Sequence, residues 1–71
     1  MQDVTLKRNS LNIVKYDKFE KDILIKRKES GLAGWEVLTA LYKQGLDRIA
    51  ILNQRDSDVI IRKGVQIVEK Q

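Results

Sequence analysis

GLAGWEVLTALYKQGL, residues 31–46, is the segment from which the fold of this chain is predicted, and it holds the single tryptophan. Its large apolar residues recur at intervals of three and four, which places them on one face of an α-helix: Leu32, Trp35, Leu38, Leu41 and Tyr42. Ser30 stands where an N-cap would, and Gly45 where a left-handed residue would close the helix. Gly34 costs about 1 kcal/mol inside a helix, so the helix begins after it or packs closely there. The pattern predicts one central helix over about 32–44.

The size and composition describe one small domain over residues 1–71. A chain this short buries only about 60% of its unfolded surface, so we expect self-association or a partner to support it. It contains no cysteine and no histidine. Disulfides, thiolate chemistry, the commonest metal ligand and the usual general base are therefore excluded. We predict a non-enzymatic protein with no catalytic residue, metal site or cofactor.

The expected location is the cytoplasm. No apolar run approaches the roughly 20 residues that span a bilayer, so we expect no membrane partner. The first ten residues, MQDVTLKRNS, lack the apolar core of a signal peptide. The absence of cysteine agrees with a reducing compartment.

Strand patterns flank the central segment on both sides. Residues 3–8 and 11–16 are linked by the turn-like Asn9-Ser10, which predicts an N-terminal β-hairpin. Residues 48–53, RIAILN, have strand propensity on both faces. Residues 58–63 and 65–69 flank Lys63-Gly64 and predict a C-terminal antiparallel hairpin, or with 48–53 a three-stranded meander.

Residues 17–29, DKFEKDILIKRKE, fit two structures. Asp17 and Glu20 have the spacing of a capping box, which favours a helix. The run Ile23-Leu24-Ile25 fits a strand, and the helix is favoured only slightly. The predicted fold class is α+β, a small single domain with an N-terminal β-hairpin, one or two helices and the C-terminal hairpin or meander. Its predicted core packs three residues of the central helix on four strand residues: Trp35, Leu38 and Leu41 on Ile49, Ile51, Ile60 and Ile67.

Charge suggests a partner. The net charge is +4 and the pI is near 9.6, a balance typical of nucleic-acid-binding proteins and also of ordinary soluble ones. Three basic clusters lie near the ends of predicted elements and are the candidate nucleic-acid contacts: Lys7, Arg8, Lys26, Arg27, Lys28, Arg62 and Lys63. If the clusters share one face, they suffice for phosphate contacts. The sequence leaves their convergence open.

The acidic pair Asp56 and Asp58 fits two interpretations, a cation site and a turn. Asp56-Ser57-Asp58 offers oxygen ligands for a divalent cation, but two carboxylates make an incomplete shell. Asp and Ser are also common turn formers, and the turn is the favoured interpretation.

Two functions follow from these features. We predict a small basic binding protein that acts on DNA or RNA as a transcription regulator or accessory factor and forms a homodimer or other homo-oligomer. The alternative is a protein–protein interaction module, such as an adaptor or inhibitor subunit on a larger protein, with no nucleic-acid role. It is suggested by the predicted hairpin 58–69, because both of its faces are largely apolar and one face needs a cover.

Overall fold

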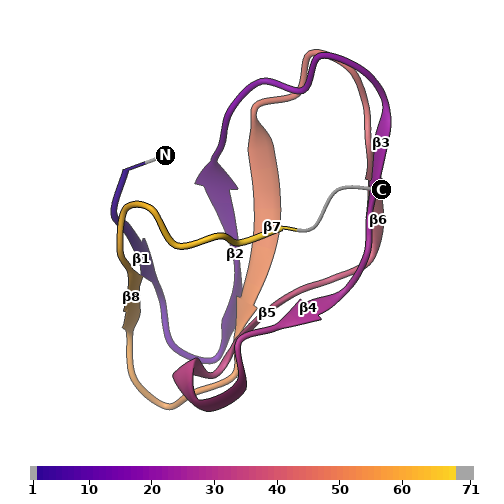
Figure 1. Ribbon diagram of the computed structural model, residues 1–71. Helices are drawn as coiled ribbons and strands as arrows, with labels where there is room; N and C mark the ends of the chain where they lie inside the picture. Colours follow the sequence, from indigo (N-terminus) through magenta and orange to yellow (C-terminus); the bar gives the residue numbers. More distant parts are fainter. Residues whose placement is uncertain (1, 69–71) are drawn as a thin grey trace.

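The computed structural model describes residues 2–68, which form short antiparallel β-strands with a single 3-10 turn (Figure 1). The elements are β1 (Val4–Leu6), β2 (Ser10–Lys15), β3 (Ile23–Ile25), β4 (Lys28–Glu29), η1 (Gly31–Ala33), β5 (Trp35–Val37), β6 (Ala40–Tyr42), β7 (Arg48–Asn53) and β8 (Val59–Ile61). A four-stranded sheet has the order β2-β7-β5-β4, and two ribbons pair β1 with β8 and β3 with β6. The fold is all-β, so the α+β prediction is wrong.

The predicted helix over 32–44 is replaced by η1, β5 and β6. Gly31 and Gly34 have φ values of 68° and 83°, which the interior of a right-handed helix excludes. The two glycines instead shape the turn that joins β4 to β5. Ser30 closes this turn, since its hydroxyl accepts a hydrogen bond from the Trp35 N–H at 2.8 Å. Ser30, the expected helix N-cap, therefore bonds to the backbone of a hairpin loop instead of a helix.

A close contact makes glycine necessary at position 34. The side chain of Arg55 crosses it, and a Cβ there would lie 2.5 Å from the Arg55 Cγ and Cδ atoms. Arg55 is held in place by a hydrogen bond of 2.8 Å from Nη1 to the Leu32 carbonyl. The close packing considered for Gly34 therefore exists, in a turn rather than in a helix.

Residues 17–29 contain β3 and β4, so the favoured helix is wrong and the strand alternative is confirmed for residues 23–25. In β3, Ile25 lies opposite Ala40, and in β4, Lys28 lies opposite Val37. The two ladders share the same register. They therefore form one long hairpin, which is interrupted by residues 26–27 on one side and residues 38–39 on the other. At the interruption the Arg27 N–H donates to Thr39 Oγ1 at 3.0 Å. β-Branched residues at 23 and 25 alternate inward, which favours the strand.

The N-terminal strands form, but they do not pair with each other. β2 pairs with β7, and β1 pairs with β8, whose partner was expected to be residues 65–69. Both predicted hairpins are therefore wrong. Residues 65–68 carry no strand, and position 69 lies outside the described residues. Figure 1 shows the consequence: β1 and β8 occupy one side of the molecule, β3 and β6 the other, and β2 and β7 run between them.

Two asparagines attach the β1-β8 ribbon to the inner face of the four-stranded sheet, where Ile49 and Ile51 are buried. Asn12 is opposite Ile51 on this face, and its Oδ1 accepts from the Lys7 N–H at 2.9 Å. Asn53 is fully buried, and its Nδ2 donates to the Leu6 carbonyl at 3.1 Å. β1 belongs to a separate ribbon with β8, and these bonds hold β1 and the turn that follows it against the sheet.

The core contains most of the expected strand residues. Trp35, Ile49, Ile51 and Ile67 are buried as predicted. The other three predicted core residues are exposed, with exposed fractions of 38%, 55% and 52% for Leu38, Leu41 and Ile60. Leu41 and Ile60 alternate with inward residues along β6 and β8, so the two-residue period of a strand turns them outward. Leu38 directly follows the end of β5. No helix in residues 2–68 is long and apolar enough to cross a membrane.

Candidate binding surfaces

The basic clusters 7–8 and 62–63 lie at opposite ends of the β1-β8 ribbon. The strands are antiparallel, with Val4 opposite Ile61 and Leu6 opposite Val59. Lys7 therefore lies beside Asp58, with 3.6 Å between Nζ and Oδ2. The convergence that the sequence left open is therefore not found for these two clusters.

Carboxylates also accompany the end of the ribbon that carries Arg62 and Lys63. Asp3 Oδ2 lies 3.5 Å from Arg62 Nη1, and Asp3 Oδ1 accepts from the Lys63 N–H. Asp56 and Asp58 have the equivalent role at the other end. Asp56 Oδ1 accepts from Asn9 Nδ2 at 2.7 Å, and Asp58 Oδ1 from the Arg8 N–H at 3.0 Å. The acidic pair thus holds a turn, as the favoured interpretation predicted.

Arg27 belongs to a polar network and is not a free cation. Its Nε and Nη2 lie 3.1 and 3.3 Å from the two carboxylate oxygens of Glu36, a residue that is only 8% exposed. Gln54 Nε2 donates to the same carboxylate at 3.1 Å, and Glu29 contacts Arg27 Nη2. The hydrogen bond to Glu36, followed by the charge of Glu29, raises the pKa of Arg27. A phosphate ligand would have to replace the hydrogen bonds between Arg27 and Glu36.

Lys28 and Arg62, from two different clusters, do come together. Both line a hollow of about 390 Å³ between β4 and the segment after β8, with Trp35 and Ile60 in its wall. Lys28 Nζ donates to the Gln66 carbonyl across the hollow at 3.0 Å. At this hollow the structure unites members of two predicted clusters.

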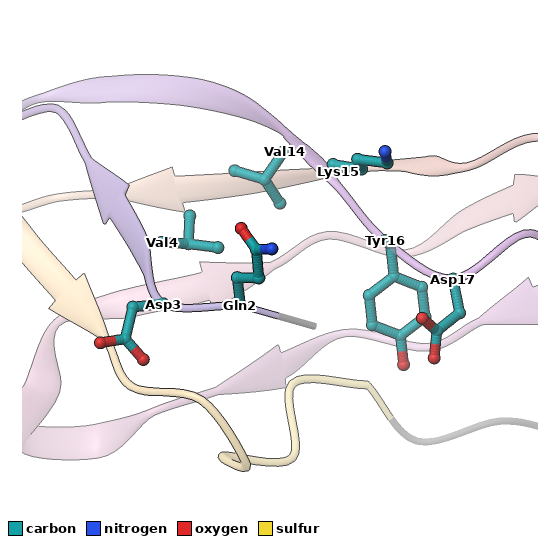
Figure 2. A pocket seen from close by; sticks show the side chains of 7 residues that line it. All are labelled: Gln2, Asp3, Val4, Val14, Lys15, Tyr16 and Asp17. Atoms are coloured by element: carbon teal, nitrogen blue, oxygen red, sulfur yellow. The ribbon is translucent and has the colours of Figure 1, made fainter.

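A second hollow, of about 400 Å³, opens between β1 and the end of β2 (Figure 2). Figure 2 shows Val4 and Val14 on its apolar side and the ring of Tyr16 beside the Asp17 carboxylate at its other end. Burial, and secondarily the charge of Asp17, raises the pKa of Tyr16. The phenol therefore stays protonated at neutral pH and can donate a hydrogen bond, but it is not poised as a base.

The outer face of the four-stranded sheet is apolar along β2 and β7. Leu11 lies opposite Leu52, and Ile13 lies opposite Ala50. Leu11 and Ile13 are 52% and 63% exposed, although both belong to the central part of a six-residue strand. Neighbouring apolar side chains on one sheet face are the type of surface that a partner covers.

β2 is also an open edge of that sheet. The Tyr16 N–H donates to the Asp47 carbonyl at 2.7 Å, so the even-numbered residues of β2 point their backbone groups toward β7. The Ala50 N–H confirms this alternation, since it points away from β2 and donates to the Tyr42 hydroxyl at 3.0 Å. The backbone N–H and C=O groups of Leu11 and Ile13 therefore point outward, and no hydrogen bond to them is found within residues 2–68.

Sequence reasoning missed this edge because it paired the wrong strands. In the predicted N-terminal hairpin, residues 3–8 pair with β2, so the edge that carries Leu11 and Ile13 would not be open. A signal was present in LNIVKY, where Leu11 and Ile13 alternate with Asn12 and Val14. Two apolar residues on one side and a buried valine on the other indicate a strand that has apolar surface on both faces.

Comparison with protein-family models, with curated proteins and with solved structures finds no match to this chain. Among residues 2–68 there is also no group of three or more acidic side chains that could hold a metal ion.

Proposed function

We propose that this protein is a small, non-enzymatic interaction module that binds protein chains through the outer face and open edge of its four-stranded sheet. The observation that carries the proposal is the exposure of Leu11 and Ile13 on an unpaired edge strand. Such an edge offers backbone hydrogen bonds and apolar side chains to the same incoming strand. The absence of cysteine supports action in the cytoplasm.

Site-specific photocrosslinking tests the proposal. A photoreactive phenylalanine analogue is placed at position 13 and, as a matched control, at position 60, which is an isoleucine of similar exposure on β8. We expect protein adducts from position 13 in cells, and we expect the Leu11→Lys substitution to remove them. Equal adduct yields from positions 13 and 60, or adducts that persist with Leu11→Lys, would contradict the proposal.

Nucleic-acid binding is a second proposal, supported by the meeting of Lys28 and Arg62 at one hollow. Trp35 lies in the wall of this hollow, and the exposed Lys26 and Lys63 stand close to Lys28 and Arg62 in the sequence. DNA or RNA would bind there through phosphate contacts, with an affinity that falls steeply with salt. A transcription-regulating or accessory role would require this surface.

The structure sharpens the test of that second role. Replacing Arg27 would also disturb Glu36, so Lys26, Lys28, Arg62 and Lys63 are changed to Gln while Arg27 is kept. We expect weaker binding to labelled oligonucleotides in fluorescence anisotropy and a shallower salt dependence. Lys18→Gln with Lys21→Gln is the control, because both residues are exposed and lie outside the predicted clusters. The same loss per charge removed in the two sets would show that only net charge matters.

A further inference from the structure

The open edge of β2 has a geometry that suits one partner in particular. We propose that β2 pairs antiparallel with β2 of a second copy of this chain, which joins two four-stranded sheets into one continuous sheet. This inference rests on the proposed function and names its partner. An unpaired strand edge is completed by another strand, and a two-fold axis lets one surface serve both copies.

The direction of the backbone groups restricts the register. Odd-numbered residues of β2 point outward, so they must form the hydrogen-bonded pairs of the new ladder. The register with the axis at Asn12 places Leu11 opposite Ile13 of the second copy, on both sides of the axis. Each of these two pairs exchanges both of its backbone hydrogen bonds.

The side chains in this register are self-complementary. Leu11 and Ile13 meet on the outer face, where they continue the apolar row that starts on β7 with Leu52. Lys15 lies opposite Asn9 of the second copy, so no like charges oppose each other directly. Asn9 has a φ of 48°, which ends the extended conformation and limits the ladder to the length of β2. Apolar pairs opposed across two strands stabilise them, whereas opposed like charges would not.

Size and charge predict how such a dimer behaves. A six-residue edge buries less than the roughly 800 Å² per partner of a standard interface, so we expect association to depend on protein concentration. Each chain carries a net charge of +4, so salt should strengthen the dimer by screening the repulsion between copies. Salt would have the opposite effect on nucleic-acid binding.

The first test is light scattering at rising concentration, where we expect the mass to increase from 8.2 kDa toward twice that value. Ile13→Lys should abolish the increase. Leu41→Lys should not, since Leu41 is similarly exposed but lies on β6. The fluorescence of Trp35 verifies that both variants fold. A mass of one chain at every concentration would overturn the proposal, and so would equal effects of the two lysine substitutions.

Cysteine crosslinking tests the register, because the chain has no cysteine of its own. A hydrogen-bonded antiparallel pair places Cα atoms about 5.5 Å apart, within the range of a disulfide. Mixing Leu11→Cys with Ile13→Cys protein should give more crosslinked dimer than either variant alone, and more than Leu11→Cys with Leu41→Cys. Equal yields in all mixtures would refute the register. If the chain is monomeric but position 13 still captures other proteins in cells, the proposed function stands and the second copy as partner is wrong.

Discussion

The side-chain amide of Asn53 is expected to be essential for the stability of the fold. It is fully buried, and it makes three hydrogen bonds to the main chain. Nδ2 donates to the carbonyls of Leu6 and Ser57 at 3.1 and 3.0 Å, and Oδ1 accepts from the Arg55 N–H at 3.0 Å. The amide thus joins β1, β7 and the turn that leads to β8.

Asn53→Ala removes all three bonds at once. The Leu6 carbonyl is then buried without its partner, at a cost of about 1–3 kcal/mol, and the two partly buried groups lose about 0.5–1.5 kcal/mol each. The expected loss is about 3 kcal/mol in the free energy of unfolding. A chain of this length has a total stability of roughly 4–10 kcal/mol, so the variant should be close to the limit of folding. Its melting temperature should fall by roughly 10–20 °C.

Urea unfolding followed by Trp35 fluorescence measures this loss, because Trp35 is only 6% exposed and is the single tryptophan. Asn12→Ala is the matched control, since Asn12 also bonds to the backbone of the β1–β2 turn but is partly exposed, and we expect a loss of about 1 kcal/mol. Equal losses for Asn53→Ala and Asn12→Ala would refute the reasoning. Asn53→Asp adds a sharper test: burial and two facing carbonyls would raise the pKa of the new carboxyl, so this variant should lose stability as pH rises.

Three further predictions follow from local contacts. Gly34→Ala should destabilise the protein more than Gly45→Ala in urea unfolding. Both glycines have a positive φ, which costs an alanine about 1–2 kcal/mol, but only at position 34 would the new Cβ also clash with Arg55. Equal losses of stability would contradict the Arg55 contact. Arg27→Lys should lower the melting temperature, because lysine cannot reproduce the two hydrogen bonds from the guanidinium to Glu36, while Lys26→Gln should leave it nearly unchanged. Thermal unfolding compares the two variants, and similar melting temperatures would contradict the network. The Gln44 N–H, followed by the charge and hydrogen bond of Lys43, lowers the pKa of Asp22 below its usual value of 3.8, so its contribution to stability is present above that pH and is lost as pH falls through the lowered pKa. The difference in stability between the native chain and Asp22→Asn should therefore shrink in acid, and a difference that is constant with pH would be inconsistent with this role.

The central segment shows why sequence pattern alone misassigned the fold. Leu32, Leu38 and Leu41 have helical spacing, but all three are exposed, and the buried residues Trp35 and Val37 follow the two-residue period of a strand. A short apolar run fits both periods, and the choice depends on what lies opposite. Here Val37 is paired with both Lys28 and Ile51, on strands far from each other in sequence. Local propensity is a weak determinant when pairing of this kind competes with it.

The candidate binding surfaces were predictable only in part. The basic residues could be identified by composition, but their separation depends on the antiparallel pairing of β1 with β8 and on the carboxylates of Asp3 and Asp58. That Lys28 and Arg62 line the same hollow also depends on the tertiary structure. The open edge of β2 could not be found without knowing that β1 pairs with β8 and not with β2.

The sequence by itself determined the size of the domain, the exclusion of thiol and imidazole chemistry, the strand at 48–53, the strand character of 4–6 and 11–15, and the burial of Trp35, Ile49, Ile51 and Ile67. These features depend on residue type or on alternation between near neighbours. Only the tertiary structure decided which strands pair, whether residues 31–46 form a helix or a hairpin, and which apolar side chains stay exposed. Strand pairing is a contact between distant segments, and here it depends on buried groups such as Asn53, whose partners are Leu6, Arg55 and Ser57. No local pattern contains that information, because the bond from Asn53 to Leu6 joins residues that are 47 positions apart in the sequence.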